Sequence, residues 1–251
     1  MKKSSLILFM FPFFLFGQVD KIKETEDEKK TKNYWYKWDI GINGGVNINN
    51  PITDNVNFNN NSFKGNLYGL TLVYHFNRFF AFKADLDIEN KGWIIENYEL
   101  PHDVNQGGGS IMNLENVTQV LDYFDVPAFI HLGFGKKLKL DLNIGPYFGF
   151  KIKDEIYSYE PDGTQLSSAD TRGAIGIGEF KNFDYGIVYG LGLDYQFHER
   201  FSIGFDVLYE KGMKAINTIN NQDYMNSSID FDFGINCRIG KKEKKIFKSD
   251  Q

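Results

Sequence analysis

Acidic side chains recur at every second position in two segments of the sequence. Asp85, Asp87 and Glu89 form one series, and Asp230 and Asp232 form another. Side chains at positions i and i+2 share one face of an extended strand, so each series places its carboxylates side by side. Carboxylates held in this way can bind a cation or divide the roles of general acid and general base. The alternative is an internal network of ion pairs and hydrogen bonds, because buried carboxylates need partners.

We favour the internal network, because cationic and polar residues recur at the same alternate positions as the acids. We predict no catalytic residue, no metal site and no cofactor. The predicted members of this interior polar network are Lys83, Asp85, Asp87, Glu89, His131, Lys139, Asp141, Asp194, Asp206, Asp230, Asp232 and Arg238.

The histidines are the other residues whose chemistry needs an interpretation. His75 and His131 fall at predicted inward positions on different strands, where they would be metal ligands, a base, or members of the same polar interior. We expect the last of these. His102 lies beside Asp103 in a predicted loop and keeps an enzyme open as an alternative. The sequence contains no serine nucleophile elbow and no defensible His-Asp-Ser set, so we predict that the protein is not an enzyme.

Two short glycine motifs resemble phosphate-binding loops only superficially. Gly176-Ile177-Gly178 and Gly190-Leu191-Gly192 do not open a helix after a strand, which phosphate binding requires. We expect Gly190 and Gly192 to leave room on the inner face of a narrow barrel.

The elements that position these side chains are two-faced strands. From Phe183 to Phe197 every second residue is apolar, with aromatic residues toward both ends, and the residues between them are mainly small or polar. The pattern lasts far longer than the roughly 5–6 residues of an average globular strand. A tilted membrane strand needs about 9–11 residues in the lipid, together with its flanking aromatic residues.

The same pattern recurs in seven further segments, which gives eight predicted strands. Short turns at Asn77-Arg78, 135–137 and 198–200 alternate strictly with long links at about 49–65, 94–119, 153–182 and 212–226. The other seven segments are Trp38 to Ile48, Tyr68 to Phe76, Phe80 to Glu89, Phe124 to Phe134, Leu138 to Phe150, Phe201 to Glu210 and Ile229 to Ile239.

This alternation of links predicts an all-β fold. We expect an eight-stranded antiparallel up-and-down transmembrane β-barrel with short periplasmic turns and long extracellular loops, located in the outer membrane. A barrel of eight strands is narrow enough for side chains to fill its interior, which argues against a general porin.

The ends of the chain suggest export. Lys2 and Lys3 precede an apolar run from Leu6 to Phe16, followed by Gly17, which is the order of a secretory signal peptide. We therefore expect a signal peptide at 1–17, a periplasmic linker at 18–34, the barrel at 35–240 and a basic tail at 241–251.

Charge and cysteine content exclude other classes. The formal net charge is −5, and there is no basic patch with interleaved aromatic residues, so we expect no nucleic-acid partner. The single cysteine, Cys237, rules out an intramolecular disulfide and is predicted to face lipid as an inert apolar side chain.

The segment from Leu121 to Lys151 resembles the PorT-like outer-membrane β-barrel family of Bacteroidota. The resemblance rests on Asp125-Val126-Pro127, Gly135-Lys136-Lys137 and Gly145-Pro146-Tyr147, and the stretch from Asp184 to Tyr209 is similar to the next hairpin of that family. These motifs are structural, so the resemblance implies a fold and a location without an activity.

Four long loops on a filled barrel favour a function in contact, because loops on a rigid scaffold usually carry the function. We predict a non-enzymatic envelope component whose extracellular loops mediate interaction or assist secretion. The alternatives are a small-solute or lipid transporter and an outer-membrane enzyme that uses loop residues. The expected partners are outer-membrane lipid, the outer-membrane insertion machinery, and envelope or secretion-system proteins.

Overall fold

The computed structural model describes residues 34–53, 60–100, 112–159, 163–167, 171, 179–219, 222–240 and 243–244. The predicted signal peptide, nearly all of the predicted linker, most of the tail and His102 lie outside the described residues. Within the described ranges, no helix is long and apolar enough to cross a membrane.

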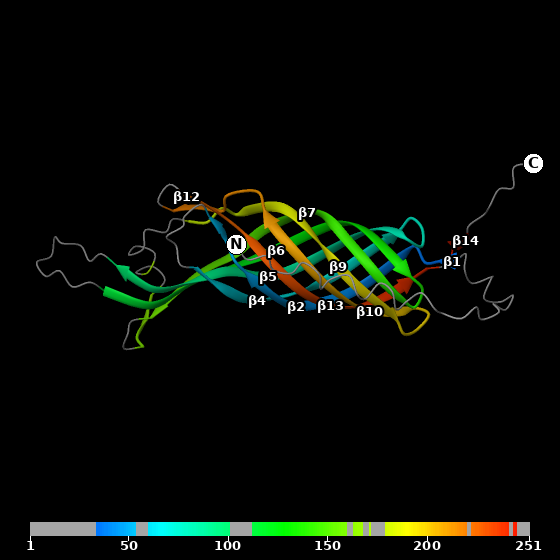
Figure 1. The fold of residues 1–251 in the computed structure, drawn as a ribbon, viewed down its shortest axis with the longest axis horizontal. Coiled ribbons are helices and arrows are strands. Elements are labelled where there is room, and N and C mark those ends of the chain that lie inside the picture. Colours follow the sequence, from blue (N-terminus) through cyan, green and yellow to red (C-terminus); the bar gives the residue numbers. More distant parts are fainter. Residues whose placement is uncertain are drawn as a thin grey trace, which may run out of the picture. The chain divides into compact units, whose positions relative to one another are not determined.

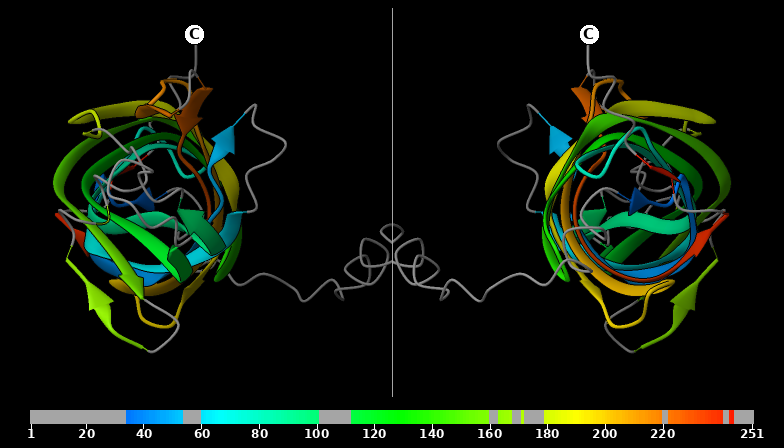
Figure 2. Two further views of the ribbon diagram at one scale, coloured as in Figure 1. Left: turned by 90° about the vertical axis from the view of Figure 1, so that its left-hand side faces the viewer. Right: turned by 90° about the vertical axis from the view of Figure 1, so that its right-hand side faces the viewer.

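Eight long antiparallel strands pair in chain order and close into a cylinder (Figure 1, Figure 2). Each strand pairs with its neighbours in the sequence, and the first barrel strand pairs with the last, which confirms the predicted up-and-down barrel. The strands are β2 (Trp38–Asn49), β4 (Asn60–His75), β5 (Phe80–Leu100), β6 (Met112–Gly135), β7 (Leu138–Tyr159), β9 (Phe183–Gln196), β10 (Phe201–Gly212) and β13 (Ser227–Ile239).

Short strands add small sheets at the ends of the long ones. β8 (Gln165–Leu166) pairs with the end of β7. The remaining pieces form a two-stranded and a three-stranded sheet, made respectively of β1 (Tyr34–Trp35) with β14 (Glu243–Lys244), and of β11 (Asn217–Ile219), β12 (Gln222–Met225) and β3 (Ile52–Thr53).

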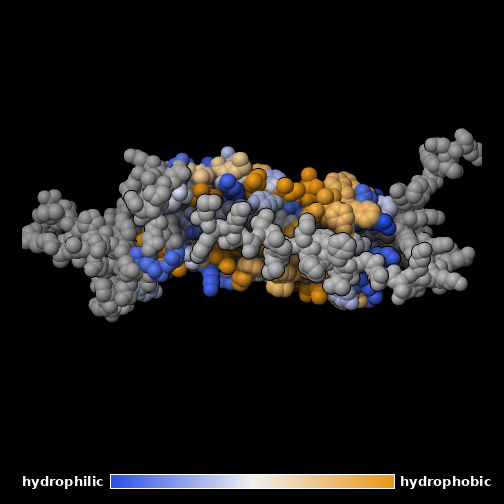
Figure 3. All heavy atoms as spheres, viewed as in Figure 1, coloured by the Kyte–Doolittle hydropathy of each residue, from blue (hydrophilic) through white to orange (hydrophobic). Residues whose placement is uncertain are grey.

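The barrel carries its apolar side chains on the outside. On β9 the exposed residues include Tyr185, Ile187, Leu191 and Leu193, whereas Val188 is fully buried. Apolar residues gather on the visible middle part of the barrel, with polar residues toward both ends (Figure 3). Soluble monomers rarely expose apolar patches larger than a few hundred Å². This outer surface, which we call the lipid belt, therefore faces hydrocarbon.

Three strands extend well beyond the lipid belt, which corrects part of the predicted loops. β5 continues to Leu100, β6 begins at Met112 and β7 continues to Tyr159, so the predicted links at 94–119 and 153–182 are partly strand. We call this extension the projection. The strands continue because their inner face stays apolar and packs into one buried cluster, made of Trp93, Ile95, Val117, Leu121, Tyr123, Ile156, Phe180, Ile216 and Tyr224.

Glycine keeps the inner wall narrow where strands β9 and β10 approach each other. A Cβ atom on Gly190 would lie 2.0 Å from the backbone oxygen of Val207, so a side chain there would force the backbone apart. Gly204, on the neighbouring strand, would place its Cβ no closer than 3.9 Å to any atom.

The contrast between these two glycines gives a test of the inner wall. Gly190→Ala should destabilise the barrel by about 1–3 kcal/mol, the usual cost of overpacking. Gly204→Ala should leave the free energy of unfolding nearly unchanged, because the added methyl would make only ordinary van der Waals contacts. Urea titration in lipid vesicles measures both, and equal effects would contradict the wall described here.

A charge on the outer face tests the lipid belt. Leu191 is 54% exposed, and its register partners Val207 and Leu142 are also exposed apolar residues. Leu191→Arg should cost about 2–4 kcal/mol, because it places a cation near the bilayer midplane. Phe197→Arg, beside a short turn, should cost only about 0–1 kcal/mol near the interface. Urea titration in vesicles measures the loss of unfolding free energy in both variants. An equal loss in Leu191→Arg and Phe197→Arg would show that the lipid belt is misplaced.

Candidate functional site

The candidate site is the polar interior of the barrel. It contains a small cavity toward the short turns, a row of bridging asparagines in the middle, and a cluster around Lys91 toward the projection. All the predicted network residues belong to barrel strands, and the strands hold them on the inner face because alternate side chains point inward.

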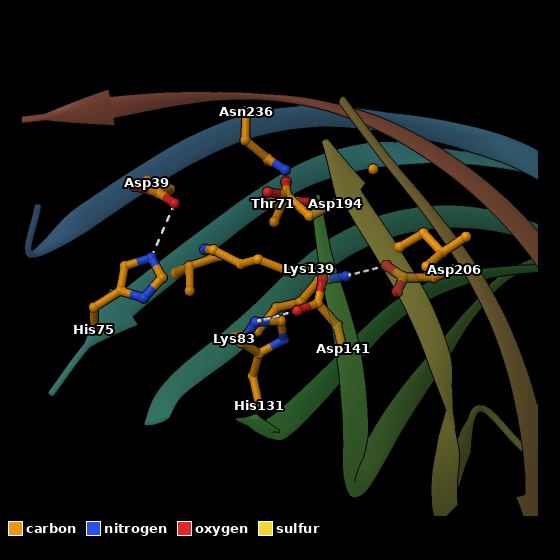
Figure 4. A pocket seen from close by; sticks show the side chains of 13 residues that line it. Asp39, Thr71, His75, Lys83, His131, Lys139, Asp141, Asp194, Asp206 and Asn236 are labelled. Atoms are coloured by element: carbon orange, nitrogen blue, oxygen red, sulfur yellow. Dashed lines mark hydrogen bonds and ion pairs between the residues drawn. The ribbon is translucent and has the colours of Figure 1, made fainter. Parts of the chain in front are cut away.

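The cavity near the short turns has a volume of about 40 Å³ and is seen in Figure 4. That volume has room for a few water molecules. It is far below the roughly 300–1,000 Å³ of small-molecule sites. Its polar lining comprises Asp39, Thr71, His75, Lys83, His131, Lys139, Asp141, Asp194, Asp206 and Asn236.

Lys83 holds the carboxylates of two strands together at this cavity. Its Nζ lies 2.9 Å from Asp206 Oδ2 and 3.3 Å from Asp85 Oδ2. Asn143 extends the chain of contacts, because its Nδ2 donates to Asp206 Oδ1 at 3.0 Å while its Oδ1 lies 2.8 Å from His131 Nδ1. The arrangement joins β5, β7, β10 and β6 across the interior.

Both predicted inward histidines have polar partners. His75 Nε2 lies 2.9 Å from Asp39 Oδ2, and His131 Nε2 lies 3.7 Å from Asp141 Oδ1. Each ring therefore contacts a carboxylate across a strand boundary, which is the environment of a structural histidine in a polar interior.

Asparagines bridge the acids in the middle of the barrel. Asn43 Nδ2 lies 2.8 Å from Asp87 Oδ1 and 3.3 Å from Asp232 Oδ2, so it donates between β5 and β13. Asn47 Nδ2 donates to Glu89 Oε1 at 2.6 Å. The sequence prediction missed both asparagines, although they fall at inward positions of the predicted strand from Trp38 to Ile48.

Lys91 is the centre of the cluster toward the projection. Its Nζ lies 2.5 Å from Glu210 Oε2, 2.6 Å from Asp125 Oδ2 and 3.1 Å from Glu89 Oε2. It also lies 4.7 Å from the ring centre of Tyr147, within cation–π distance. The prediction missed Lys91 because it ended the strand at Glu89, one alternation too early.

Asp184 lies beside this cluster and accepts hydrogen bonds from two uncharged side chains. Its Oδ2 accepts hydrogen bonds from Tyr147 Oη at 3.0 Å and from Asn226 Nδ2 at 2.7 Å. These contacts tie β9 to β7 and to the segment that follows β12.

Two predicted network members have weaker connections than expected. Lys139 lines the small cavity beside Asp141 and Asp194. Arg238 lies opposite Asp39 in the strand register, and its backbone N–H donates to the Arg200 oxygen at 2.8 Å. Among the described residues, no ion pair links the Arg238 side chain to the network.

Removing one buried cation tests whether the interior network holds the barrel together. Lys83→Met leaves Asp85 and Asp206 without their ammonium partner and should cost about 3–5 kcal/mol, as expected when one partner of a buried pair is lost. Lys153→Met removes an exposed lysine paired with Glu155 and should leave the free energy of unfolding nearly unchanged. Similar urea midpoints for Lys83→Met and the unmodified chain would rule out a stabilising role for Lys83.

Solved structures of small outer-membrane proteins are similar to this chain at low identity. OprG from Pseudomonas aeruginosa is 15% identical, with 81% of this chain and 98% of OprG covered and a TM-score of 0.45. Ail of Yersinia pestis is 14% identical, with coverage of 81% and 99% and a TM-score of 0.37. Neisserial surface protein A is 11% identical, with coverage of 80% and 97% and a TM-score of 0.38.

No curated protein matches the sequence significantly. A family described as the outer membrane protein beta-barrel domain matches residues 24–214, which is well over half of the chain. With its closed eight-stranded barrel and exposed lipid belt, the protein therefore belongs to the outer membrane protein beta-barrel domain family and resides in the bacterial outer membrane.

Proposed function

We propose that the protein is a non-enzymatic outer-membrane component whose extracellular projection and loops bind another envelope or extracellular molecule. The observation that carries this proposal is the projection of β5, β6 and β7, which continues as ordered sheet beyond the lipid belt. These three strands hold a rigid surface outside the membrane, where a partner can reach it.

The outer edge of the lipid belt can be located on β5 and β6. The unbroken run of apolar outward residues stops after Ile88 and Phe124, and the next outward pair is Asn90 and Asp122, joined by a hydrogen bond of 2.6 Å. From Asp122 to Met112 the strand continues for about 30 Å, at roughly 3.3 Å per residue. The projection therefore stands clear of the hydrocarbon.

The inner side of the projection is rigidly packed. Trp93 stacks against Tyr224, with ring centroids 6.0 Å apart, and lies 5.4 Å from the ring of Phe180. This buried cluster fixes the projection and covers the extracellular end of the polar interior. A rigid, closed platform suits recognition, because it reduces the entropy lost on binding.

The outer side of the projection presents a polar and aromatic ladder on β7. Lys153 Nζ lies 2.5 Å from Glu155 Oε1, and Tyr157 Oη donates to Glu155 Oε2. The hydrogen bonds from Lys153 and Tyr157 lower the pKa of Glu155, which lies beyond the lipid belt. Glu155 is therefore ionised at neutral pH, and the ladder offers charge and aromatic surface together, a combination used in recognition.

The PorT-like resemblance supports the same proposal and adds assistance to secretion as a more specific role. The chain carries Asp125-Val126-Pro127 at the centre of β6 and Gly145-Pro146-Tyr147 on β7, the motifs that suggested that family. Membership of the PorT-like group would be consistent with assistance to secretion. No catalytic set supports an enzyme among the residues that the structure describes.

A small-solute transporter is the second candidate, and the polar cavity beside Lys83 favours it. That cavity lies near the short turns, and the cluster around Trp93 covers the other end of the interior. Planar-bilayer recordings separate the two proposals. The contact function predicts no single-channel steps, and steps that persist in the folded protein would favour transport.

Site-specific photocrosslinking in living cells tests the contact function. A photoreactive amino acid at Tyr157 should give a discrete adduct with one protein or with surface polysaccharide. The same group at Ile144, an exposed belt residue on the same strand, should give only lipid adducts. Lys153→Glu should weaken the Tyr157 adduct, because it reverses the charge beside Glu155.

Folding is monitored by the mobility shift of the barrel on heating in detergent. A folded barrel that gives no discrete adduct from Tyr157, or an adduct that Lys153→Glu leaves unchanged, would contradict a binding role for this ladder.

A further inference from the structure

Every short turn of the barrel carries at least one exposed cation. The three turns lie together at the end of the barrel away from β12 (Figure 1), and the short turns of outer-membrane barrels face the periplasm. We call the four cations the basic rim: Arg78 between β4 and β5, Lys136 and Lys137 between β6 and β7, and Arg200 between β9 and β10.

Backbone hydrogen bonds join the three turns into one continuous edge. The amide of Gly133 donates to the carbonyl oxygen of Phe79 at 2.8 Å, which links the turn of Arg78 to the end of β6. The amide of Gln196 donates to the carbonyl oxygen of Lys137 at 2.7 Å, which links the next turn to the end of β9. The cations of the basic rim are therefore neighbours in space, although they are far apart in the sequence.

The positive charge of the basic rim has little opposition. Glu199 is the only acidic residue in the three turns, and its Oε1 accepts a hydrogen bond from Tyr36 Oη at 3.0 Å. Among the residues that the structure describes, no carboxylate forms an ion pair with any of the four cations. The rim is therefore an exposed surface that attracts anions.

The lipid belt begins directly beside the basic rim. Each cation lies at most two residues from an exposed apolar residue of the belt, which is within about 7 Å at roughly 3.3 Å per residue. The headgroup region on each side of the hydrocarbon is itself about 5–8 Å thick. The four cations therefore lie at the depth of lipid headgroups. The flanking apolar residues are Phe76, Phe80, Phe134, Leu138, Phe197 and Phe201.

Aromatic rings hold both arginines of the rim. Arg78 Cζ lies 4.2 Å from the ring centre of Phe79, which is 40% exposed. Arg200 Cζ lies 5.5 Å from the ring centre of Tyr36. A guanidinium group that lies over a ring keeps its N–H donors at its edge, and this planar fork matches the oxygen atoms of a phosphate.

We propose that the basic rim binds the phosphate groups of anionic phospholipids in the periplasmic leaflet of the outer membrane. The partner is a lipid because the rim is continuous with the lipid belt and lies at headgroup depth. The bound headgroups fix the depth of the barrel in the bilayer. This site is separate from the extracellular projection and does not depend on the contact function proposed above.

Phosphatidylglycerol and phosphatidylcholine are the probes for the experiment, because they differ in headgroup charge. The full chain is folded in a neutral detergent, and native mass spectrometry measures the dissociation constant of the first bound lipid of each kind. The unmodified protein should bind phosphatidylglycerol at least about fivefold more tightly, which is the effect of one basic residue near anionic headgroups.

The decisive variant neutralises the whole rim by combining Arg78→Gln, Lys136→Gln, Lys137→Gln and Arg200→Gln. Its affinities for the two lipids should agree within about twofold, because the charge that distinguishes the headgroups has no partner left. All four positions are exposed, so the variant should still fold, and the mobility shift on heating reports its folded fraction.

Two control variants show whether the rim itself is responsible. Arg78→Lys with Arg200→Lys retains all four charges and should keep the preference for phosphatidylglycerol. Lys211→Gln removes an exposed lysine near the other end of β10 and should keep that preference as well.

Three results would overturn the proposal. They are equal affinities of the unmodified protein for the two lipids, a preference that survives in the neutralised rim, and a preference that Lys211→Gln abolishes. Inorganic phosphate, added at the same concentration as the lipid and at constant ionic strength, should not displace phosphatidylglycerol. Displacement would show a site for free anions and would equally refute the assignment to lipid.

Discussion

The absence of water in hydrocarbon is the constraint on which this structure depends. A strand edge in lipid leaves N–H and C=O groups without partners, at several kcal/mol for each group. Pairing of β2 with β13 removes the last free edge of the barrel sheet. Closure in turn produces a narrow enclosed interior, and the alternation of side chains along each strand sends one half of them into it. The polar interior is thus a consequence of the closed backbone.

Closure also explains why the protein has apolar side chains outside and polar side chains inside, the reverse of a soluble protein. The apolar side chains of the barrel face lipid. The hydrophobic effect is therefore not the main force that packs the interior. Directional contacts join the strands across the interior, such as Asn43 between Asp87 and Asp232, and Lys83 between Asp85 and Asp206. A small buried apolar cluster lies among them, made of Phe129, Tyr147, Val188 and Leu208. Glycines such as Gly190 let opposing backbones approach where no side chain fits.

The two ends of the interior differ in chemistry. Toward the short turns the barrel contains a small polar cavity, whereas toward the projection the inner face becomes apolar around Trp93 and Tyr224. An apolar cluster outside the membrane is an ordinary hydrophobic core, because water is again the surrounding solvent. The projection is therefore stabilised as a soluble domain is, and it forms a base for the extracellular contacts proposed above.

Sequence alone determined the number of barrel strands, their order, their facing and the inward position of residues such as Asp85 and His131, because a period of two shows directly which side chains share a face. It did not determine where the strands end. The sequence pattern ends this strand at Glu89, whereas in the structure Lys91 and Trp93 continue the same inner face. Packing of Trp93 against Phe180 and Tyr224 from distant segments keeps the sheet ordered. Only the closed tertiary structure brought Glu89, Asp125 and Glu210 together around Lys91, because side chains on β5, β6 and β10 meet only across the interior of a complete barrel.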